Sequence, residues 1–285
     1  MCIRDRPRAE VYDAIIRCQA AGIQVKMITG DQQLTAQSIG EDLNITKPHI
    51  EAVGGDKLQE LSDEAMRDIS KGTSIFSRVT PEQKMRIVTA LQDEGEVVAM
   101  TGDGVNDAPA LSRANIGISM GIAGTDVAKD ASDMVLQDDN FANIVNAVEE
   151  GRKIYANIRN FVRYQVSTNV AAVALLLLAS VVLQLPLPLT ATQILVINIL
   201  MDGPPAVALG VEGKHANVMD RPPRPVDESL PNLIDLMLIF YLGAVMVAGS
   251  LIVYELALDT GEEYARTSLL YTSDAADDVY SVDIG

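Results

Sequence analysis

The stretch TGDGVNDAPAL (residues 101–111), which follows the apolar run EVVAM (residues 96–100), decides the fold of the first half of the chain. An apolar run that ends in Gly, Asp and Asn is typical of a buried strand followed by a polar loop. The pattern recurs at IQVKMI (residues 23–28), which ends in Thr29, Gly30 and Asp31. Further strands are expected at residues 74–79, 115–120 and 133–136, and helices at 9–21 and 80–92. This alternation predicts an α/β fold with a parallel sheet, whose ligands bind beyond the carboxyl ends of the strands.

The loop 101–111 places two carboxylates, Asp103 and Asp107, close together. Gly, Asp and Asn are also ordinary turn residues, so this composition alone is more often structural than catalytic. Two carboxylates in one tight loop repel each other unless a cation lies between them, and Mg²⁺ prefers oxygen ligands with few protein contacts. Gly102 and Gly104 would let backbone N–H groups approach an anion. The loop therefore predicts a site for Mg²⁺ and phosphate.

A lysine is expected near the same edge of the sheet. Thr80 can cap the helix 80–92, Pro81 suits its first position, and Gln83 completes a capping box. Lys84 then lies in the first turn. A lone helix lysine is usually a solvated surface residue, but here it would bring a cation to the rim where the carboxylates gather, as a phosphoryl group requires.

The second half of the chain has the composition of a membrane protein. No charged residue lies between Arg163 and Asp202, and about 20 apolar residues span a bilayer core. We expect transmembrane helices at about 162–185, 190–211 and 233–258, the first continuing a stalk helix that would carry motion to the bilayer. The alternative is a buried helical hairpin of a soluble protein.

Charge sets the expected partners and orientation. The net charge of −17 in 285 residues argues against nucleic acid as a partner. Basic residues precede the first span and follow the second, so these segments and everything before about residue 160 are expected in the cytoplasm, with the lipid bilayer as a partner. The two cysteines, Cys2 and Cys18, predict no disulfide framework.

Polar residues inside the predicted spans are the candidates for a transport site, because a carboxylate in lipid persists only when it is paired or faces a cavity. Asp202 follows Asn198 by four residues, on the same face of an α-helix, and precedes Gly203, Pro204 and Pro205. Paired prolines would break the helix and free backbone carbonyls. The alternative is an aspartate at a helix end that meets headgroup water.

MITGD (residues 27–31), the lysine of TPEQKMRIV and TGDGVNDAPAL resemble the second, third and fourth motifs of the phosphorylation domain of P-type ATPases, a branch of the haloacid dehalogenase superfamily. The resemblance implies a Rossmann-like haloacid-dehalogenase fold followed by transmembrane helices. It implies that Thr29 and Gly30, with Asp31 beside them, contact the phosphoryl group, that Lys84 neutralises it, and that Asp103 binds Mg²⁺ with support from Asn106 and Asp107.

QILVINILMDGPPAVALGVE and VMDRPPRP resemble the calcium-transporting members of this family, especially the secretory-pathway and bacterial types. The resemblance implies that Asn198 and Asp202 bind transported Ca²⁺, with Asn169 as a further candidate. Two oxygen ligands of the sarcoplasmic-reticulum pump are replaced by Ala172 and Met201, which suggests one transported ion per cycle. Val207 stands where pumps that also move Mn²⁺ have glutamine.

Other parts of the family are absent from this sequence. The phosphorylated aspartate lies in Asp-Lys-Thr-Gly-Thr, which Asp56-Lys57-Leu58 does not match, and no segment resembles the actuator domain, the nucleotide-binding domain or the first four membrane helices. We therefore expect a C-terminal fragment that cannot hydrolyse ATP alone: residues 7–150 in the phosphorylation domain and 151–268 in stalk and membrane helices. Residues 1–6 and 269–285 match neither pattern and are expected to be foreign.

Three rival functions remain open. The first is a P-type pump for Mn²⁺, Na⁺ or H⁺. The second is a membrane-anchored phosphatase of the dehalogenase superfamily, which would need a nucleophilic Asp-x-Asp before Thr29, where none occurs. The third is an inactive membrane scaffold derived from a pump, against which the intact Lys84, Asp103 and Asp107 argue.

Overall fold

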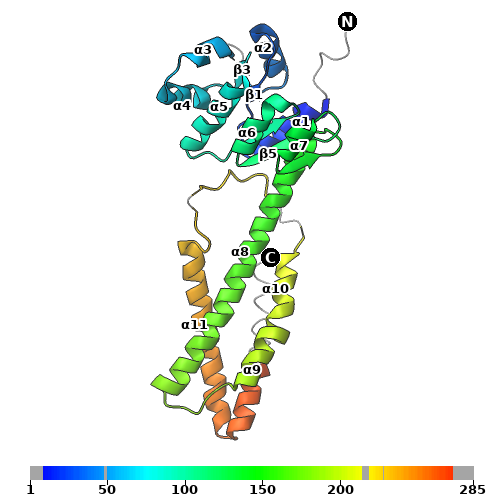
Figure 1. Cartoon of the computed structure of the whole chain (residues 1–285). Helices are drawn as coiled ribbons and strands as arrows, with labels where there is room; N and C mark the ends of the chain where they lie inside the picture. The colour runs from blue at the N-terminus through cyan, green and yellow to red at the C-terminus, as the bar shows by residue number, and fades with distance from the viewer. Residues whose placement is uncertain (1–8, 48–49, 214–217, 227, 272–285) are drawn as a thin grey trace. The chain divides into compact units, whose positions relative to one another are not determined.

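The computed structural model describes residues 9–47, 50–213, 218–226 and 228–271, which belong to two compact units (Figure 1). Residues 1–149 and 219–227 make the first unit, and residues 150–218 and 228–285 the second. The ends expected to be foreign lie outside the described residues, except that 269–271 end a helix covering 262–271. The predicted domain boundaries stay predictions.

The first unit contains two three-stranded parallel sheets. One has the order β1-β3-β2, with β1 at Met27–Ile28, β2 at Val53–Gly54 and β3 at Ile75–Ser77. The other has the order β4-β5-β6, with β4 at Ala99–Gly102, β5 at Ile116–Met120 and β6 at Met134–Leu136. The predicted parallel α/β fold is confirmed, but its strands form two sheets among the described residues instead of one.

Seven helices are described in the first unit ahead of the first span: α1 (Ala9–Ala20), α2 (Gln33–Asp42), α3 (Gly55–Gln59), α4 (Asp63–Gly72), α5 (Pro81–Asp93), α6 (Ala108–Arg113) and α7 (Asp126–Asp130). The predicted capping box of α5 is present: the Thr80 hydroxyl accepts from the Gln83 N–H, and the Gln83 side chain accepts from the Thr80 N–H. Helix α5 packs Ile87 into the core around Phe76 of the first sheet and Val88 into the core around Met100 of the second. It therefore joins the two sheets.

Strand β1 is shorter than the predicted residues 23–28. Gly22 ends α1 in the left-handed conformation, with φ of 75°, as its sequence position predicts. The N–H of Ile23 bonds back to the carbonyl of Cys18, which binds this part of the chain to the helix end instead of to a neighbouring strand. Only Met27 and Ile28 then pair with β3.

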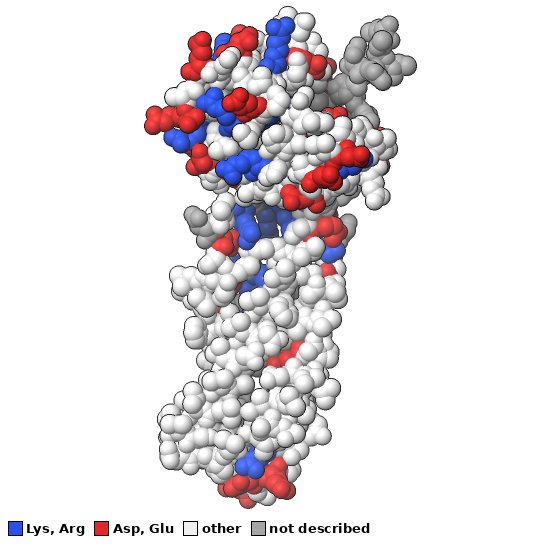
Figure 2. Space-filling view, in the orientation of Figure 1, with Lys and Arg blue, Asp and Glu red and all other residues white. Residues whose placement is uncertain are grey.

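The second unit holds the apolar helices. Besides the helix at 262–271, its described elements are α8 (Ala142–Leu177, which begins in the first unit), η3 (Leu178–Val182), α9 (Ala191–Val196), η4 (Ile197–Met201), α10 (Gly203–Gly210) and α11 (Leu233–Leu258). Three stretches among them are long and apolar enough to cross a membrane: Ala142–Val182, Ala191–Gly210 and Leu233–Leu258. Three candidate spans are thus confirmed, whereas the predicted bounds of the first, 162–185, lie largely within a longer helix that begins at Ala142. Figure 2 shows charged side chains over the first unit and few along these helices.

A buried ion pair fixes α11 against α8. Asp235, whose residue surface is 0% exposed, accepts hydrogen bonds at 3.1 Å from Arg159 Nε and at 2.5 Å from Arg163 Nε. The same carboxylate caps its own helix by accepting from the Asn232 N–H at 3.1 Å, while the Asn232 side chain accepts from the Asp235 N–H. One carboxylate therefore sets both the start of α11 and its contact with α8.

Replacing this carboxylate should destabilise the second unit. Asp235→Ala leaves two arginines facing each other without their anion, so we expect the free energy of unfolding to fall by about 3 kcal/mol, because removing one partner of a buried ion pair leaves uncompensated charge. Denaturant unfolding of the chain in detergent measures this. Glu262→Gln, which breaks the more exposed pair with Arg266, serves as the control and should cost less than about 0.5 kcal/mol. Equal losses in the two variants would refute the anchoring role of Asp235.

Candidate functional site

The loop after β4 is built around Asp107. Its Oδ1 accepts from Lys84 Nζ at 2.6 Å, and its Oδ2 accepts from the Gly104 N–H at 3.2 Å. The Lys84 and Asp107 side chains are 15% and 10% exposed, so the ion pair is mostly shielded from water. Lys84 comes from the first turn of α5 and Asp107 from the 3₁₀ turn η2 (Val105–Asp107). The structure thus brings together a cation and a carboxylate that lie 23 positions apart in the sequence.

Gly102 makes this arrangement possible. A Cβ atom built at position 102 would lie 2.5 Å from the Cβ atom of Asp107, closer than two such atoms approach in proteins. The last residue of β4 must therefore lack a side chain if Asp107 is to reach Lys84. This steric requirement is a reason for glycine at position 102 that the sequence analysis did not give.

The other carboxylate of the loop, Asp103, is exposed, as is the neighbouring Asn106. The backbone of Asp103 is held, because its carbonyl accepts from the Thr125 N–H at 2.8 Å at the start of α7. Mg²⁺ binds proteins through one or two carboxylates and completes its shell with water and phosphate oxygens. An exposed carboxylate on a fixed backbone, beside a paired one, fits such an ion. Among the described residues there is no group of three acidic, His or Cys ligands for a metal held by protein alone.

The residues after β1 form a turn whose backbone is bonded to the segment after β3: the carbonyls of Asp31 and Thr29 accept from the N–H groups of Arg78 and Val79. The Thr29 hydroxyl donates to the Asp31 carboxylate at 2.9 Å, and the Asp31 N–H donates to the Thr29 hydroxyl oxygen at 3.1 Å. Thr29 is half-buried, whereas Gly30 and Asp31 are exposed. Within the described part of the chain, no hydrogen bond or ion pair joins this turn to Lys84 or Asp107. The turn at residues 29–31 and the loop that holds Asp103 and Asp107 do both follow the carboxyl ends of parallel strands, β1 and β4, as predicted.

In the second unit, Asp202 lies inside the helix bundle, 2% exposed, between η4 and α10. Its N–H bonds to the carbonyl of Ile197, five residues earlier, so the turn before it is π-helical. Pro204 and Pro205 have no N–H, so the carbonyls of Leu200 and Met201 cannot receive the usual α-helical hydrogen bonds. The predicted break is therefore present as a local interruption at Asp202, between η4 and α10, within one span.

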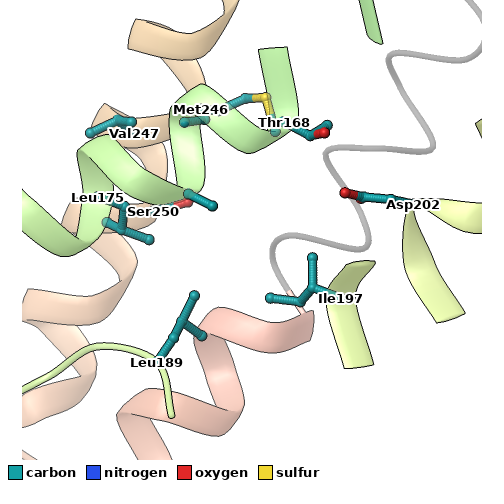
Figure 3. Close-up of a pocket in the computed structure, with 10 residues that line it drawn as sticks. Thr168, Leu175, Leu189, Ile197, Asp202, Met246, Val247 and Ser250 are labelled. Atoms are coloured by element: carbon teal, nitrogen blue, oxygen red, sulfur yellow. The ribbon is translucent and has the colours of Figure 1, made fainter. Parts of the chain in front are cut away.

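A cavity of about 40 Å³ adjoins Asp202 (Figure 3). The Asp202 cavity, as we call it, is lined by three residues with side-chain oxygens: Thr168 of α8, Asp202 and Ser250 of α11. Its remaining wall is apolar and includes Leu189 and Met246. The Asp202 carboxylate points into the space between the helices, and Thr168 and Ser250 lie across it.

The two asparagines predicted as ligands lie elsewhere. Asn198 is exposed and does not line the Asp202 cavity. The expectation of a common face used α-helical spacing, whereas Asn198 belongs to the π-helical segment Ile197–Met201. Asn169 is also exposed, and its side-chain amide donates to the carbonyl of Gln165 at 2.7 Å. The structure therefore groups Asp202 with Thr168 and Ser250, and the roles of the asparagines stay predictions.

The sequence analysis missed Ser250, although a serine after Gly249 in an otherwise apolar span was a usable signal. It also missed the link from Asp235 to the arginines of α8. The capping pattern from Asn232 to Asp235 was readable in the sequence, but partners 72 and 76 positions away were not.

Comparison with known proteins agrees with both units. Residues 1–115 match the haloacid dehalogenase-like hydrolase family, and residues 186–274 match the C-terminus of cation-transporting ATPases. The chain is 45% identical over 278 residues to calcium-transporting ATPase 1 of Schizosaccharomyces pombe, covering 95% of this chain and 31% of that protein.

Two further relatives are also named calcium-transporting ATPases. The chain is 51% identical over 222 residues to the calcium-transporting ATPase of Bacillus subtilis, covering 78% of this chain and 25% of that protein. It is 45% identical over 252 residues to the human calcium-transporting ATPase type 2C member 1, covering 88% of this chain and 27% of that protein. The chain thus spans between a quarter and a third of the length of these relatives.

The steric role of Gly102 can be tested by stability. Gly102→Ala should push Asp107 away from Lys84 and lower the free energy of unfolding by about 1–3 kcal/mol, the usual cost of overpacking. Gly72→Ala is the matched control, because a Cβ at that helical position meets no atom within 4 Å and should be neutral or slightly stabilising. Thermal unfolding of both variants distinguishes them, and a Gly102→Ala protein as stable as the parent would contradict the proposed contact.

Proposed function

We propose that this chain, which belongs to the P-type calcium-transporting ATPases as a C-terminal portion, forms the phosphate-handling and ion-binding parts of an ATP-driven Ca²⁺ pump. The observation that carries the proposal is the buried Asp202 carboxylate beside a cavity among helices that can cross a membrane. A carboxylate is costly in such surroundings, and a transported cation would offset that cost. The names of the relatives favour Ca²⁺ over Na⁺ or H⁺ as the cation.

In the first unit, the residues at the carboxyl ends of the strands would handle the phosphoryl group. Lys84 would place its positive charge beside the transferred group, with Asp107 holding the ammonium in position. Thr29 and Gly30 would contact the phosphoryl oxygens, and Asp31 would orient the Thr29 hydroxyl to which it is bonded. Asp103 would hold Mg²⁺, with Asn106 beside it in the loop. When bound, this ion neutralises phosphate charge.

The acceptor aspartate and the ATP-binding residues would come from parts of the complete pump that this sequence does not contain, together with the actuator domain and the first four membrane helices. On this proposal, the chain alone does not hydrolyse ATP. Phosphoryl transfer depends mainly on placement and charge neutralisation, which is what Lys84 and the loop around Asp107 provide.

In the full-length pump, Asp202→Asn should abolish phosphorylation by ATP at the Ca²⁺ concentrations that saturate the parent. Losing the buried charge should raise the half-saturating Ca²⁺ concentration by at least about 100-fold, because a buried charge and its partner are strongly coupled. Labelling with radioactive ATP across a Ca²⁺ titration measures this. Asp259→Asn, at an exposed aspartate just beyond α11, is the matched control. An unchanged Ca²⁺ dependence in Asp202→Asn would refute the site.

Asp103→Ala should act differently, by slowing phosphorylation about 100-fold at every Ca²⁺ concentration through loss of Mg²⁺. The initial rate of phosphorylation at saturating Ca²⁺ is the measurement. Asp68→Ala removes another exposed carboxylate of the first unit and should leave the rate unchanged. A normal rate in Asp103→Ala would exclude this carboxylate as the Mg²⁺ ligand.

A further inference from the structure

The Asp202 cavity receives oxygen atoms from three different helices. Thr168 lies on α8, Asp202 between η4 and α10, and Ser250 on α11. The other lining residues have side chains of carbon or of carbon and sulfur only: Ala171, Ala172, Leu175, Leu189, Ile197, Met246 and Val247. The three polar side chains are therefore the chemically distinct part of the cavity surface.

The Thr168 hydroxyl is oriented by its own helix. It donates its proton to the carbonyl of Gln165 at 3.2 Å, and the side chain is largely buried, at 7% residue exposure. A hydroxyl that has donated its proton presents only acceptor lone pairs to other partners. Thr168 can thus accept from a water, whereas the Ser250 hydroxyl can donate or accept.

The size of the cavity suits water. A volume of about 40 Å³ exceeds the roughly 10–15 Å³ that one water needs by the same measure, and a buried water requires two to four polar partners. Thr168, Ser250 and Asp202 supply three. An apolar cavity of this size would stay dry, so these side chains decide whether water is held.

We propose that Ser250 and Thr168 hold a water beside the Asp202 carboxylate and that this water fills one place in the shell of the cation bound at Asp202. This inference rests on the proposed function. Ca²⁺ takes six to eight oxygen ligands and accepts water among them, while one carboxylate supplies at most two. The third span, α11, is then a positioning element for the cation, acting through Ser250.

Ser250 carries no charge and acts on the cation only through the water. Its loss therefore weakens the affinity for the cation but does not change the phosphorylation chemistry of the first unit. Removing one hydrogen-bond partner of the water should raise the half-saturating Ca²⁺ concentration about five-fold, with no change in the maximal phosphoenzyme level. A purely structural role would instead lower the maximal level, because fewer molecules would be folded.

The test compares Ser250→Ala, Ser250→Thr and Ser180→Ala in the full-length pump, by Ca²⁺ titration of phosphorylation from ATP. Ser250→Thr keeps the hydroxyl and should behave as the parent. Ser180→Ala removes a hydroxyl from the π-helical segment η3, away from the lining of the cavity, and should have no effect.

The proposal is supported if the half-saturating Ca²⁺ concentration rises in Ser250→Ala and in neither of the other two variants. A parent pump with normal Ca²⁺ dependence and an unshifted Ser250→Ala would overturn the role of Ser250 while leaving the proposed function standing. A shift of equal size in Ser180→Ala, or a failure of threonine to restore affinity, would also overturn it. A parent protein without Ca²⁺ dependence would overturn the proposed function and this inference together.

Discussion

The ion pair between Lys84 and Asp107 is the interaction on which the first unit depends. Lys84 belongs to the helix that follows β3, and Asp107 to the loop that follows β4, so the pair links the carboxyl ends of two separate parallel sheets. Helix α5 joins the cores of the same sheets through Ile87 and Val88. Apolar packing and an ion pair, both made by α5, thus hold the two sheets together. On the proposed function, a lysine held beside a carboxylate at this edge would partly neutralise the charge of a phosphoryl group.

The two buried carboxylates of the second unit show how different partners give different roles. Asp235 is fully buried and bonded to two arginines and to the start of its own helix, which makes it an anchor. Asp202 is nearly as buried, but it lies beside a cavity lined also by two hydroxyl-bearing side chains. Arginine neutralises a carboxylate permanently, whereas a cavity leaves room for an exchangeable cation or water. This contrast supports Asp202, and not Asp235, as the proposed transport site.

Local patterns predicted much of the fold. The capping box at Thr80 and Gln83, the left-handed Gly22 and the three apolar spans all follow from interactions between residues close in sequence, and the structure confirms them. The division of the strands into two sheets was not predictable in this way, because strand pairing depends on contacts distant in the chain. The two-residue strand β2 also carries too little pattern to be recognised.

The candidate sites were predicted unevenly for similar reasons. The loop motif identified Asp103 and Asp107, but only the structure shows that Asp107 pairs with Lys84 while Asp103 stays exposed. In the membrane half, α-helical spacing grouped Asn198 with Asp202, and the π-helical turn between them separates the exposed asparagine from the buried aspartate. Ser250 joins the cavity from a span 48 positions further on, where a serine in an apolar segment is a weak signal that does not indicate which residues it meets.

The central claim is that the pump containing this chain moves Ca²⁺ at the expense of ATP. The most direct measurement is the accumulation of radioactive Ca²⁺ in sealed vesicles that contain the full-length protein, with ATP and Mg²⁺ supplied outside. We expect saturable Ca²⁺ uptake that requires both ATP and Mg²⁺, and release of the accumulated Ca²⁺ by a Ca²⁺ ionophore. ATP hydrolysis that drives Na⁺ or H⁺ movement with no Ca²⁺ uptake, or phosphatase activity without any transport, would contradict it.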